Sequence, residues 1–527
     1  MKHPELIGLL AIALLLRLAC VPWGLPSQTG TLSSNHPDET YTFLALEHMK
    51  STHSLHPGLG LLYGSLHTYM TGALLGAAMV TGFVHPGSRD YLLDHPEMLD
   101  RMYLTARLFS VLAGLLSLCV LFVLARRWAG RRTAFFAAFV LAFAPGAIIY
   151  NSYIKVECLL LFWIALIAAS AQRYLAKREP RGLVVTGALI GLAAATKYTG
   201  GIFILALPVL LWLGNGSFKS LLGGILASAV FFLIGNPYAL LDFPSFRAAL
   251  VQQSGMAVNA PLWEIGQGNG FWRMASYYVP FAVGWGPWLI SLVGVFLLIR
   301  KREDNFARFV AMMALMSFLA AAIPPTRFVG YTIPMLPWIV LAGAYALNWF
   351  WTEVRGGSWL VCVVLATQAA FAAGFVSLAR PPDPRTQASQ WLQTHVPKGT
   401  SVGIFKSYFW TPAILRQRNS PFQVMRASED QDALGTGQTR FKSLKPLPRW
   451  WVVSELETRE YLRSPTWYPE QAAGIRALFD TYEVKASFSK PVPFGRWRQW
   501  RRPLPWDYRY LAPSIDILHI KENGSHD

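Results

Sequence analysis

The chain has 527 residues, of which 53% are hydrophobic and only 14% charged, and its formal net charge is +18. In soluble proteins about a quarter of all residues are charged, so this composition excludes an ordinary soluble enzyme and indicates a polytopic membrane protein. The positive charge alone would fit a nucleic-acid-binding protein. Many of the basic residues, however, occupy short loops between apolar runs, where they orient helices, and we expect no nucleic-acid partner.

The first apolar segment covers residues 6–22 and follows a basic residue. A cleaved signal peptide begins in the same way, but no clean small-x-small cleavage site follows here. Because many apolar segments come later in the chain, the sequence favours a retained first helix.

Runs of about 17–25 apolar residues are long enough to cross a membrane as helices. Such runs lie near 6–22, 105–125, 132–150, 156–175, 220–236, 281–299, 306–323, 331–350 and 357–378. The stretch 183–213 is too long for one helix and is interrupted by "TKYTGG", so it predicts two. The expected fold is a bundle of about eleven transmembrane helices.

Residues 59–84 are also apolar enough to cross the membrane, but the distribution of charge argues against a span there. Without this span, and with the N-terminus in the cytoplasm, the basic loops 126–132, 173–182 and 300–308 all face inward, as the positive-inside rule requires. We therefore expect residues 59–84 to lie along the outer interface. They would belong to a long first outer loop, 23–104, that contains interfacial helices.

The same topology divides the chain into a membrane module, residues 1–378, and an extracytoplasmic domain, residues 379–527. In the second part "SVGIFKS", "RWWVVSEL", "YEVKASFSK" and "IDILHI" predict strands, whereas "RTQASQWLQTHV" and "PEQAAGIRALFDTY" predict helices. The expected domain is a small α/β domain on the periplasmic or extracellular side of a cell inner (plasma) membrane. The four cysteines have no metal-type or disulfide-framework spacing.

Ionisable residues gather near the outer ends of the predicted helices, although those helices are far apart in the sequence. They are Asp38 and Glu39 in the first outer loop, Arg107, Lys155, Glu157, Lys197 and Arg327. Taken singly, each has an ordinary explanation as a loop charge, a helix-start acid or a cation that reaches the headgroups. Their convergence at one membrane depth instead indicates a functional site.

Cations at the level of the outer headgroups suit a lipid-linked phosphate. A carboxylate beside them could act as general base toward a hydroxyl or amine. Together these groups fit displacement of a lipid phosphate by an incoming acceptor, with the cations stabilising the departing phosphate. Three histidines, His36, His56 and His67, lack metal-ligand spacing, and we expect no bound metal.

Several stretches resemble the GT-C membrane glycosyltransferases, in particular the bacterial relatives of the dolichyl-phosphate-mannose protein mannosyltransferases. They are "HPDETY" after the first helix, "ARLFSVLAGLLS", "GLAAATKYTG", "GNPYALLDFPSF", "TRFVGYTIPMLP" and the tail opening "DPRTQASQWLQTHVPKGTSV". The resemblance extends from residue 1 to about residue 415. It implies a GT-C-like fold and a polyprenyl-phosphate monosaccharide as donor, with transfer that inverts the anomeric carbon.

The resemblance implies that Asp38 is the catalytic base and that Glu39 orients the acceptor or the base. Glu157 matches a second acidic position found in some members, including the aminoarabinose–lipid A transferases. Candidates for binding the donor phosphate are Lys155, Lys197, Arg107 and Arg327, and Arg107 is also a candidate structural partner of the first loop. We place His36, His56 and Tyr331 in the substrate groove.

The sequence also departs from this resemblance. The tail does not resemble the β-trefoil repeat of eukaryotic protein mannosyltransferases, so the acceptor, whether lipid, glycan or protein, stays open. The "WWDYG" signature of oligosaccharyltransferases is absent, and "PWDYRY" is only a fragment of similar letters. We therefore expect no cofactor and no requirement for a divalent metal.

The main alternative function is a transporter or flippase that moves a lipid-linked substrate without chemistry. It predicts polar residues near the bilayer midplane rather than at the outer end. A membrane-anchored binding protein would leave Asp38, Glu39 and the cations unexplained. A phosphoethanolamine-type transferase would need a metal-binding outer domain, and the tail shows no ligand spacing for one.

Overall fold

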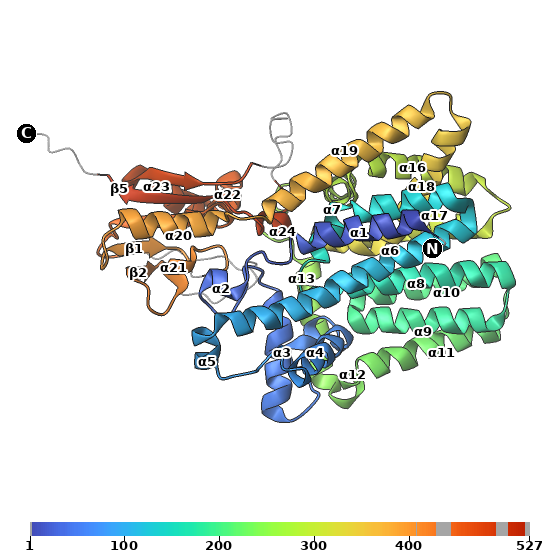
Figure 1. Ribbon diagram of the computed structural model, residues 1–527, viewed down its shortest axis with the longest axis horizontal. Helices are drawn as coiled ribbons and strands as arrows, with labels where there is room; N and C mark the ends of the chain where they lie inside the picture. Colours follow the sequence, from blue (N-terminus) through green and yellow to red (C-terminus); the bar gives the residue numbers. More distant parts are fainter. Residues whose placement is uncertain (1–2, 407, 428–443, 492–503, 522–527) are drawn as a thin grey trace, which may run out of the picture.

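The structure is a computed structural model that describes residues 3–406, 408–427, 444–491 and 504–521. Figure 1 shows an elongated molecule with a bundle of long helices at one end and a small domain containing a β-sheet at the other. Helices α3 and α4 of the first loop lie beside the bundle at the end nearer the sheet (Figure 1). The mostly helical architecture with a C-terminal α/β domain is the fold class that the sequence predicts.

The long apolar segments form the helical bundle. Its elements are α1 (Pro4–Leu18), α6 (Pro96–Ala142), α8 (Val156–Lys177), α9 (Pro180–Thr196), η2 (Tyr198–Leu205), α10 (Ala206–Gly214), α11 (Phe218–Gly235), α16 (Trp285–Arg300), α17 (Asn305–Ala322), η4 (Val329–Met335), α18 (Leu336–Glu353) and α19 (Gly357–Leu378).

Shorter helices occupy the long connections. They are α2 (Pro26–Thr29), α3 (Glu39–Thr52), η1 (Gly58–Leu62), α4 (Ser65–Val80), α5 (Arg89–Asp94), α7 (Pro145–Tyr150), α12 (Tyr238–Leu241), α13 (Phe243–Val258), α14 (Gly270–Arg273), η3 (Met274–Tyr278) and α15 (Val279–Val283).

Six helices of the described chain are long and apolar enough to cross a membrane, and a bent pair that meets at a 115° angle would make a seventh. The segments 66–80, 180–196 and 198–214 form shorter apolar helices. The protein is thus a multi-pass membrane protein, whereas the count of eleven spans stays a prediction.

Two predicted spans have different boundaries in the structure. The range of α6 contains two helices that meet across a kink at Gly130, whose φ of 89° and ψ of 179° are not helical and are accessible to glycine without strain. The kink lies within the basic segment 126–132, between the predicted spans 105–125 and 132–150. The predicted span 132–150 stops at Ala142, because Pro145, which cannot donate a backbone hydrogen bond, begins the separate helix α7. The segment 59–84 is divided between η1 and α4, and its position relative to a bilayer stays a prediction.

Small residues allow close packing inside the bundle. Helices α9 and α11 approach at Gly187, where a Cβ atom would lie 1.9 Å from the carbonyl oxygen of Gly224. A second contact of this kind occurs at Gly191, where a Cβ atom would lie 2.3 Å from the carbonyl oxygen of Ser228. In membranes such small-residue contacts replace the hydrophobic effect as a source of helix association.

The C-terminal domain contains a five-stranded sheet in the order β2-β1-β3-β5-β4. Its strands are β1 (Ser401–Ile404), β2 (Gln423–Arg426), β3 (Trp450–Ser454), β4 (Tyr482–Phe488) and β5 (Ile515–Ile520). Strand β1 pairs in parallel with β2 and β3, while β5 is antiparallel to β3 and β4. The four predicted strands are confirmed, and β2 is an additional one.

Helices cover both faces of this sheet. They are α20 (Pro384–His395), α21 (Ala413–Arg416), α22 (Glu455–Arg463) and α23 (Pro469–Thr481), followed by the short α24 (Trp506–Arg509). Ile517 packs in one buried cluster with Leu392 of α20, and its neighbour Leu518 packs in another with Ile475 of α23. This alternation along β5 is the period of two expected of a strand buried on both faces.

The segment around α24 joins the domain to the bundle. Tyr508 is fully buried and shares the main hydrophobic core of the bundle, where its hydroxyl donates to the carbonyl oxygen of Phe281 at 3.1 Å. The ring of Trp506 stacks on Trp263 at 4.8 Å, and the indole of Trp23 donates to the carbonyl oxygen of Leu511 at 2.9 Å. The domain is therefore packed into the bundle rather than tethered to it.

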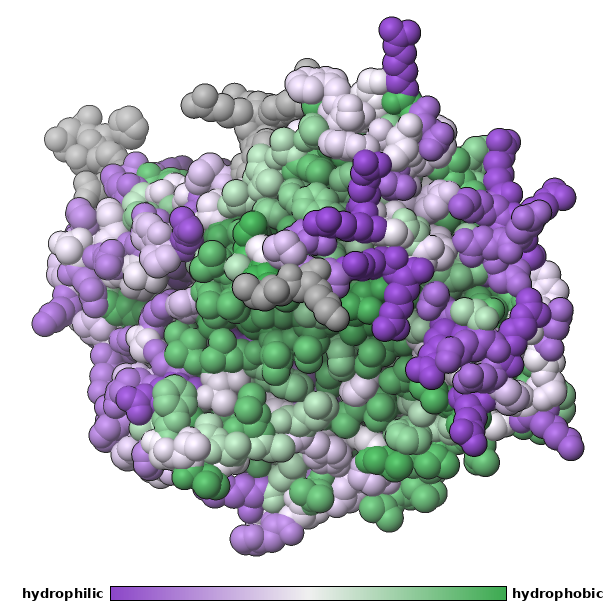
Figure 2. Space-filling view, turned by 45° about the vertical axis from the view of Figure 1, so that its right-hand side comes forward, coloured by the Kyte–Doolittle hydropathy of each residue, from purple (hydrophilic) through white to green (hydrophobic). Residues whose placement is uncertain are grey.

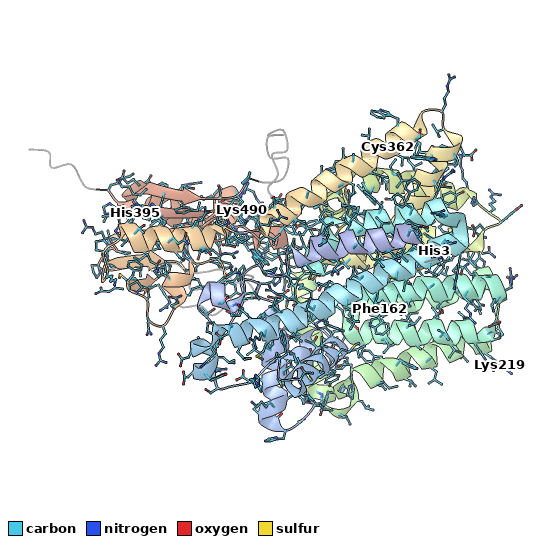
Figure 3. All side chains as sticks on the ribbon, in the orientation of Figure 1. His3, Phe162, Lys219, Cys362, His395 and Lys490 are labelled. Carbon is cyan, nitrogen blue, oxygen red and sulfur yellow. The ribbon has the colours of Figure 1, made fainter. Side chains whose placement is uncertain are left out.

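The surface carries a charge asymmetry. Figure 2 shows a broad hydrophobic area in the middle of one face, with long hydrophilic side chains gathered at its right-hand side. Basic residues of the expected inner loops meet at a shared surface depression, which is lined by Arg127, Arg178, Arg300, Lys301 and Arg302 among others. In Figure 3, His3 and Lys219 mark the far end of the bundle, whereas His395 lies in the C-terminal domain. The basic loops thus share one end of the bundle, and the orientation of the termini stays a prediction.

Candidate active site

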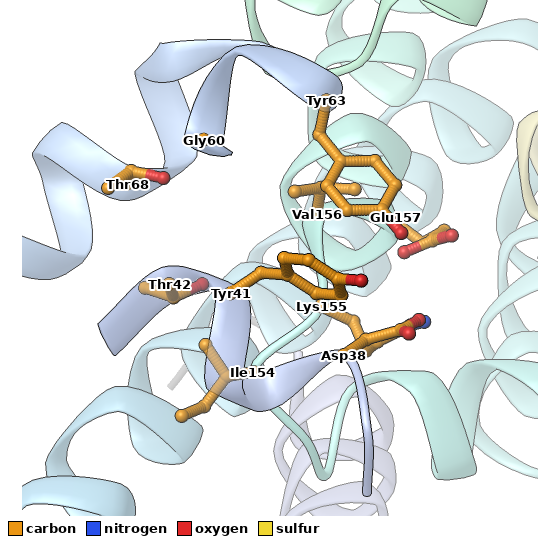
Figure 4. A pocket seen from close by; sticks show the side chains of 10 residues that line it. All are labelled: Asp38, Tyr41, Thr42, Gly60, Tyr63, Thr68, Ile154, Lys155, Val156 and Glu157. Atoms are coloured by element: carbon orange, nitrogen blue, oxygen red, sulfur yellow. The ribbon is translucent and has the colours of Figure 1, made fainter. Parts of the chain in front are cut away.

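A pocket of about 390 Å³ lies where the first loop meets the start of α8. It is lined by Asp38, Tyr41, Thr42, Gly60, Tyr63, Thr68, Ile154, Lys155, Val156 and Glu157. Figure 4 shows that the hydroxyls of Tyr41 and Tyr63 and the charged ends of Asp38, Lys155 and Glu157 point toward the same side. Two of the three predicted carboxylates, Asp38 and Glu157, and one predicted cation, Lys155, thus share a pocket with hydroxyl groups.

Asp38 stands immediately before α3, at the end of the irregular loop that follows α2. Its carboxylate pairs with Lys155 and its side chain is 29% exposed, so a substrate can reach it. Burial acts to raise the pKa of Asp38, but the Lys155 charge outweighs it and holds the pKa at about 2. The carboxylate is therefore ionised at neutral pH. It would become more basic if the ammonium of Lys155 moved to another anion.

Glu39 is completely buried and its carboxylate has a donor on every side. Nε and Nη2 of Arg107 bind its two oxygens at 2.8 and 2.6 Å, the amide of Ile154 donates to it at 2.9 Å, and the Ser34 hydroxyl donates as well. Burial acts to raise the pKa of Glu39, but Arg107 and these hydrogen bonds lower it. These contacts leave the carboxylate no free oxygen for an acceptor.

Arg107 connects the first loop to the start of the chain as well. Its Nη1 donates to the carbonyl oxygens of Val21 and Trp23 at 2.5 and 2.7 Å, and the guanidinium is not exposed at all. A group engaged on both sides in this way has little capacity for a phosphate. The contacts favour the structural alternative for Arg107 over the phosphate-binding one.

The second acid–base pair lies beside the first. Lys197, which ends α9 in an extended conformation, places its Nζ 2.8 Å from Oε1 of Glu157. The other oxygen, Oε2, is buried without a hydrogen-bond partner among the described residues. The ammonium of Lys197 also lies 5.2 Å from the ring centroid of Tyr331. Three predicted residues from α8, the end of α9 and η4 thus come together.

Lys155 is the centre of this cluster. Its ammonium pairs with Asp38 and lies 5.3 Å from the ring centroid of Tyr150. Burial acts to lower the pKa of Lys155, but the charges of Asp38 and Glu157 raise it above its usual value. Two carboxylates and two ammonium groups therefore neutralise one another in this structure, and an incoming phosphate would compete for both cations.

Seven predicted residues lie outside the lining of the pocket. Glu39, Arg107, Lys197 and Tyr331 are described above, and the other three are His36, His56 and Arg327. His36 is buried, its Nδ1 accepts from the Asp38 amide at 3.2 Å, and burial lowers its pKa to about 4, so that it supports the loop as a neutral ring. His56 bonds Oδ2 of Asp242 at 3.1 Å. Arg327 bonds Oε2 of Glu264 at 3.0 Å and is buried among backbone carbonyls.

Other site residues had no clear signal in the sequence. Tyr41, Tyr63 and Thr68 line the pocket, but aromatic and hydroxyl residues are frequent throughout the chain. Asp507 of the C-terminal domain accepts from the Tyr150 hydroxyl, beside Lys155, although "PWDYRY" matched no motif. Among the described residues no three His, Cys, Asp or Glu side chains form a group that could hold a metal ion, and metal independence stays a prediction.

Known proteins share this architecture. Residues 98–240 match the family model of the dolichyl-phosphate-mannose-protein mannosyltransferases. The structure matches ArnT from Cupriavidus metallidurans bound to undecaprenyl phosphate with a TM-score of 0.53 and 16% sequence identity, over 98% of each chain. The oligosaccharyltransferase of Archaeoglobus fulgidus, tethered to an acceptor peptide, matches with a TM-score of 0.50 and 14% identity, over 93% of this chain and 73% of that one.

A comparison with curated proteins found no sequence that matches this chain. The identities to the solved structures are too low to transfer an activity, and they establish the fold alone. The family match covers the segment that contains Arg107, Lys155, Glu157 and Lys197. It therefore relates the part of the chain that supplies the cations of the pocket to membrane glycosyltransferases.

Proposed function

We propose that this protein of GT-C fold is an inverting glycosyltransferase that uses a polyprenyl-phosphate monosaccharide as its donor. The observation that carries the proposal is the cluster of Asp38, Lys155, Glu157 and Lys197 around one pocket. A phosphate requires cations and an acceptor hydroxyl requires a base, and the cluster supplies both. The match of residues 98–240 to a mannosyltransferase family supports the reading of the pocket as a transfer site.

In the proposed reaction the donor phosphate binds the ammonium groups of Lys155 and Lys197. Lys155 then no longer neutralises Asp38, whose carboxylate becomes a stronger base. The acceptor hydroxyl or amine attacks the anomeric carbon from the side opposite the phosphate, and its proton passes to Asp38. The bond between the anomeric carbon and the phosphate oxygen breaks, and its electron pair stays on the phosphate, which the two lysines stabilise.

The supporting residues have separate roles in this proposal. Glu39 and Arg107 hold the loop that presents Asp38, so Glu39 orients the base rather than the acceptor. Glu157 holds Lys197 in place until the donor arrives. Hydroxyls of Tyr41 and Tyr63 would bind the sugar or the acceptor, and burial raises the pKa of Tyr63 well above its usual value, which keeps that hydroxyl protonated.

The proposal predicts that Asp38→Asn abolishes transfer. Radiolabelled sugar transfer would be measured in purified membranes with a panel of polyprenyl-phosphate sugars, with and without chelator. Loss of a general base costs about 100-fold or more in rate. We expect at least this loss in Asp38→Asn, and we expect wild-type transfer to survive the chelator.

Glu47→Gln is the matched control, because Glu47 lies on the same helix and its side chain is 54% exposed in a pair with Arg89. It should transfer sugar at the wild-type rate. Full activity of Asp38→Asn would contradict the role of Asp38 as base. Movement of a lipid-linked substrate across vesicle membranes without any sugar transfer would favour the transporter alternative.

A further inference from the structure

Asp507 in α24 brings the C-terminal domain into the neighbourhood of the two lysines. Its Oδ2 accepts a hydrogen bond from the hydroxyl of Tyr150 and a second one, at 2.8 Å, from the backbone amide of Val329. Its Oδ1 is buried without a hydrogen-bond partner among the described residues. Both donors belong to the helical bundle, so this carboxylate forms its hydrogen bonds outside the C-terminal domain that carries it.

Each donor to Asp507 belongs to an element that supports one lysine of the pocket. Tyr150 ends α7, and its ring faces the ammonium of Lys155 at 5.3 Å. Val329 begins η4, which carries Tyr331, and the ring of Tyr331 faces the ammonium of Lys197 at 5.2 Å. One oxygen atom therefore binds the hydroxyl of Tyr150 directly and, through the Val329 amide, the start of the short helix that carries Tyr331.

The rest of α24 holds Asp507 firmly in this position. Tyr508 is completely buried in the core of the bundle, and Trp506 stacks on Trp263. Next in the chain, the ring of Tyr510 meets the ring of His36 edge-on at 5.8 Å, and His36 in turn accepts from the Asp38 amide. The segment thus contacts the supports of both the cations and the base.

We propose that Asp507 is a positioning residue of the transfer site, through which the C-terminal domain fixes Tyr150 and η4 and so places Lys155 and Lys197 for the donor phosphate. This inference rests on the proposed function. Cation–ring contacts are worth more when they are desolvated, and an ammonium displaced by about 1 Å loses much of its effect on a reacting group. Without α24, the helical bundle would lack the carboxylate that holds Tyr150 and η4 in place.

The test compares Asp507→Ala, Tyr150→Phe and the double variant in full-length protein in lipid nanodiscs. Two quantities are measured: the donor KM and kcat of sugar transfer, and the affinity for undecaprenyl phosphate. We expect Asp507→Ala and Tyr150→Phe each to raise the donor KM and weaken undecaprenyl phosphate binding about tenfold, with a smaller effect on kcat. The double variant should be no worse than Asp507→Ala alone, because that variant already removes the acceptor of the Tyr150 hydroxyl.

Two further variants make the outcome specific. Asp507→Asn retains an oxygen acceptor and is expected to keep the donor KM within about threefold of wild type. Asp516→Ala changes a carboxylate of the same domain that bonds only Ser487 in the described contacts, and it should match wild type. If Asp507→Ala fails to fold, Tyr150→Phe, which keeps its ring, decides the question in its place.

Wild-type donor KM and wild-type affinity for undecaprenyl phosphate in folded Asp507→Ala or in Tyr150→Phe would overturn the inference, as would an Asp507→Asn variant as impaired as the alanine one. If wild-type protein transfers no sugar from any donor but binds undecaprenyl phosphate, the proposed function fails, and the binding measurements alone decide the role of Asp507. Wild-type protein that binds no undecaprenyl phosphate would overturn both.

Discussion

Two neighbouring carboxylates, those of Asp38 and Glu39, differ in their exposure to solvent, and this difference supports the different roles proposed for them. Asp38 is partly exposed in the pocket and has one ammonium partner, whereas Glu39 is fully buried and held by Arg107, Ser34 and the Ile154 amide. A base must be able to exchange its partner, and a fully bonded carboxylate cannot do so. In the proposed reaction Asp38 is therefore the reactive residue of this adjacent pair, and Glu39 is the supporting one.

Glu39→Gln is expected to destabilise the protein rather than to reduce its rate selectively. Removal of one partner of a buried ion pair leaves the other charge uncompensated, which costs about 3–5 kcal/mol. We expect a melting temperature well below that of wild type for the purified protein, and an intermediate one for the double variant Glu39→Gln/Arg107→Met. Asp38→Asn should lower the melting temperature less than Glu39→Gln does, because the Asp38 side chain is 29% exposed whereas that of Glu39 is completely buried. A wild-type melting temperature for Glu39→Gln would refute the supporting role.

At the scale of elements, the position of each helix depends on close contacts as much as on hydrophobic length. Helix α9 approaches α11 through Gly187 and Gly191, and α9 ends at Lys197. The packing of these two helices therefore determines where one cation of the pocket lies. Apolar length predicted that α9 and α11 exist, but it contained no information on which helix each one packs against.

Gly187→Ala is expected to weaken this contact, because a Cβ atom there would lie 1.9 Å from the Gly224 carbonyl oxygen, and backbone atoms cannot move aside cheaply. The cost should be about 1–3 kcal/mol, read as a lower melting temperature. Gly8→Ala is the matched control on α1, where no atom lies within 4 Å of the added Cβ. It should be neutral or stabilising, since alanine favours helix by about 1 kcal/mol over glycine. Equal melting temperatures for the two variants would contradict the packing argument.

The sequence predicted which ionisable residues lie at the same membrane depth, because that depth follows from the apolar lengths and the distribution of basic loops. Charge asymmetry and apolar length placed Asp38, Lys155, Glu157 and Lys197 at one depth, and the structure brings all four together. The sequence could not identify the partner of each charged residue, because spacing along the chain does not show which charges pair. For that reason the role of Arg107 stayed open, and the partners of His56 and Arg327, namely Asp242 and Glu264, were unforeseen.

The whole molecule joins two units with different physical environments, and its stability should depend on pH through the C-terminal one. Burial raises the pKa of Glu457 to about 7 and that of Asp507 to about 6. Both carboxyls bind a proton in the folded protein at a pH where the unfolded chain has released it. The contribution of these two groups to the stability therefore falls as the pH rises through 6 and 7, and it is regained on acidification toward pH 5.

Between pH 8 and pH 5.5 the folded protein gains stability from Glu457 and Asp507 and loses stability at His36, whose pKa burial lowers to about 4, so the test compares the pH dependence of the melting temperature between variants. Glu457→Gln should make the change in melting temperature on acidification less positive than in wild type, because the neutral amide removes one of the two groups that add stability. Glu470→Gln, on the exposed face of α23, is the control and should keep the wild-type slope. The same pH dependence in Glu457→Gln and in wild type would contradict the role of Glu457, whereas Asp38, with its pKa near 2, does not titrate over this range.

Docking of α24 also has a consequence for the order of events during biosynthesis. Asp38 and the bundle are synthesised long before Asp507, whose carboxylate links Tyr150 to Val329. A nascent chain can therefore insert its helices and even bind a lipid carrier while its cations are still unconstrained. In the proposed role of Asp507, Lys155 and Lys197 therefore reach their final positions only when the last part of the chain has been made and α24 has docked.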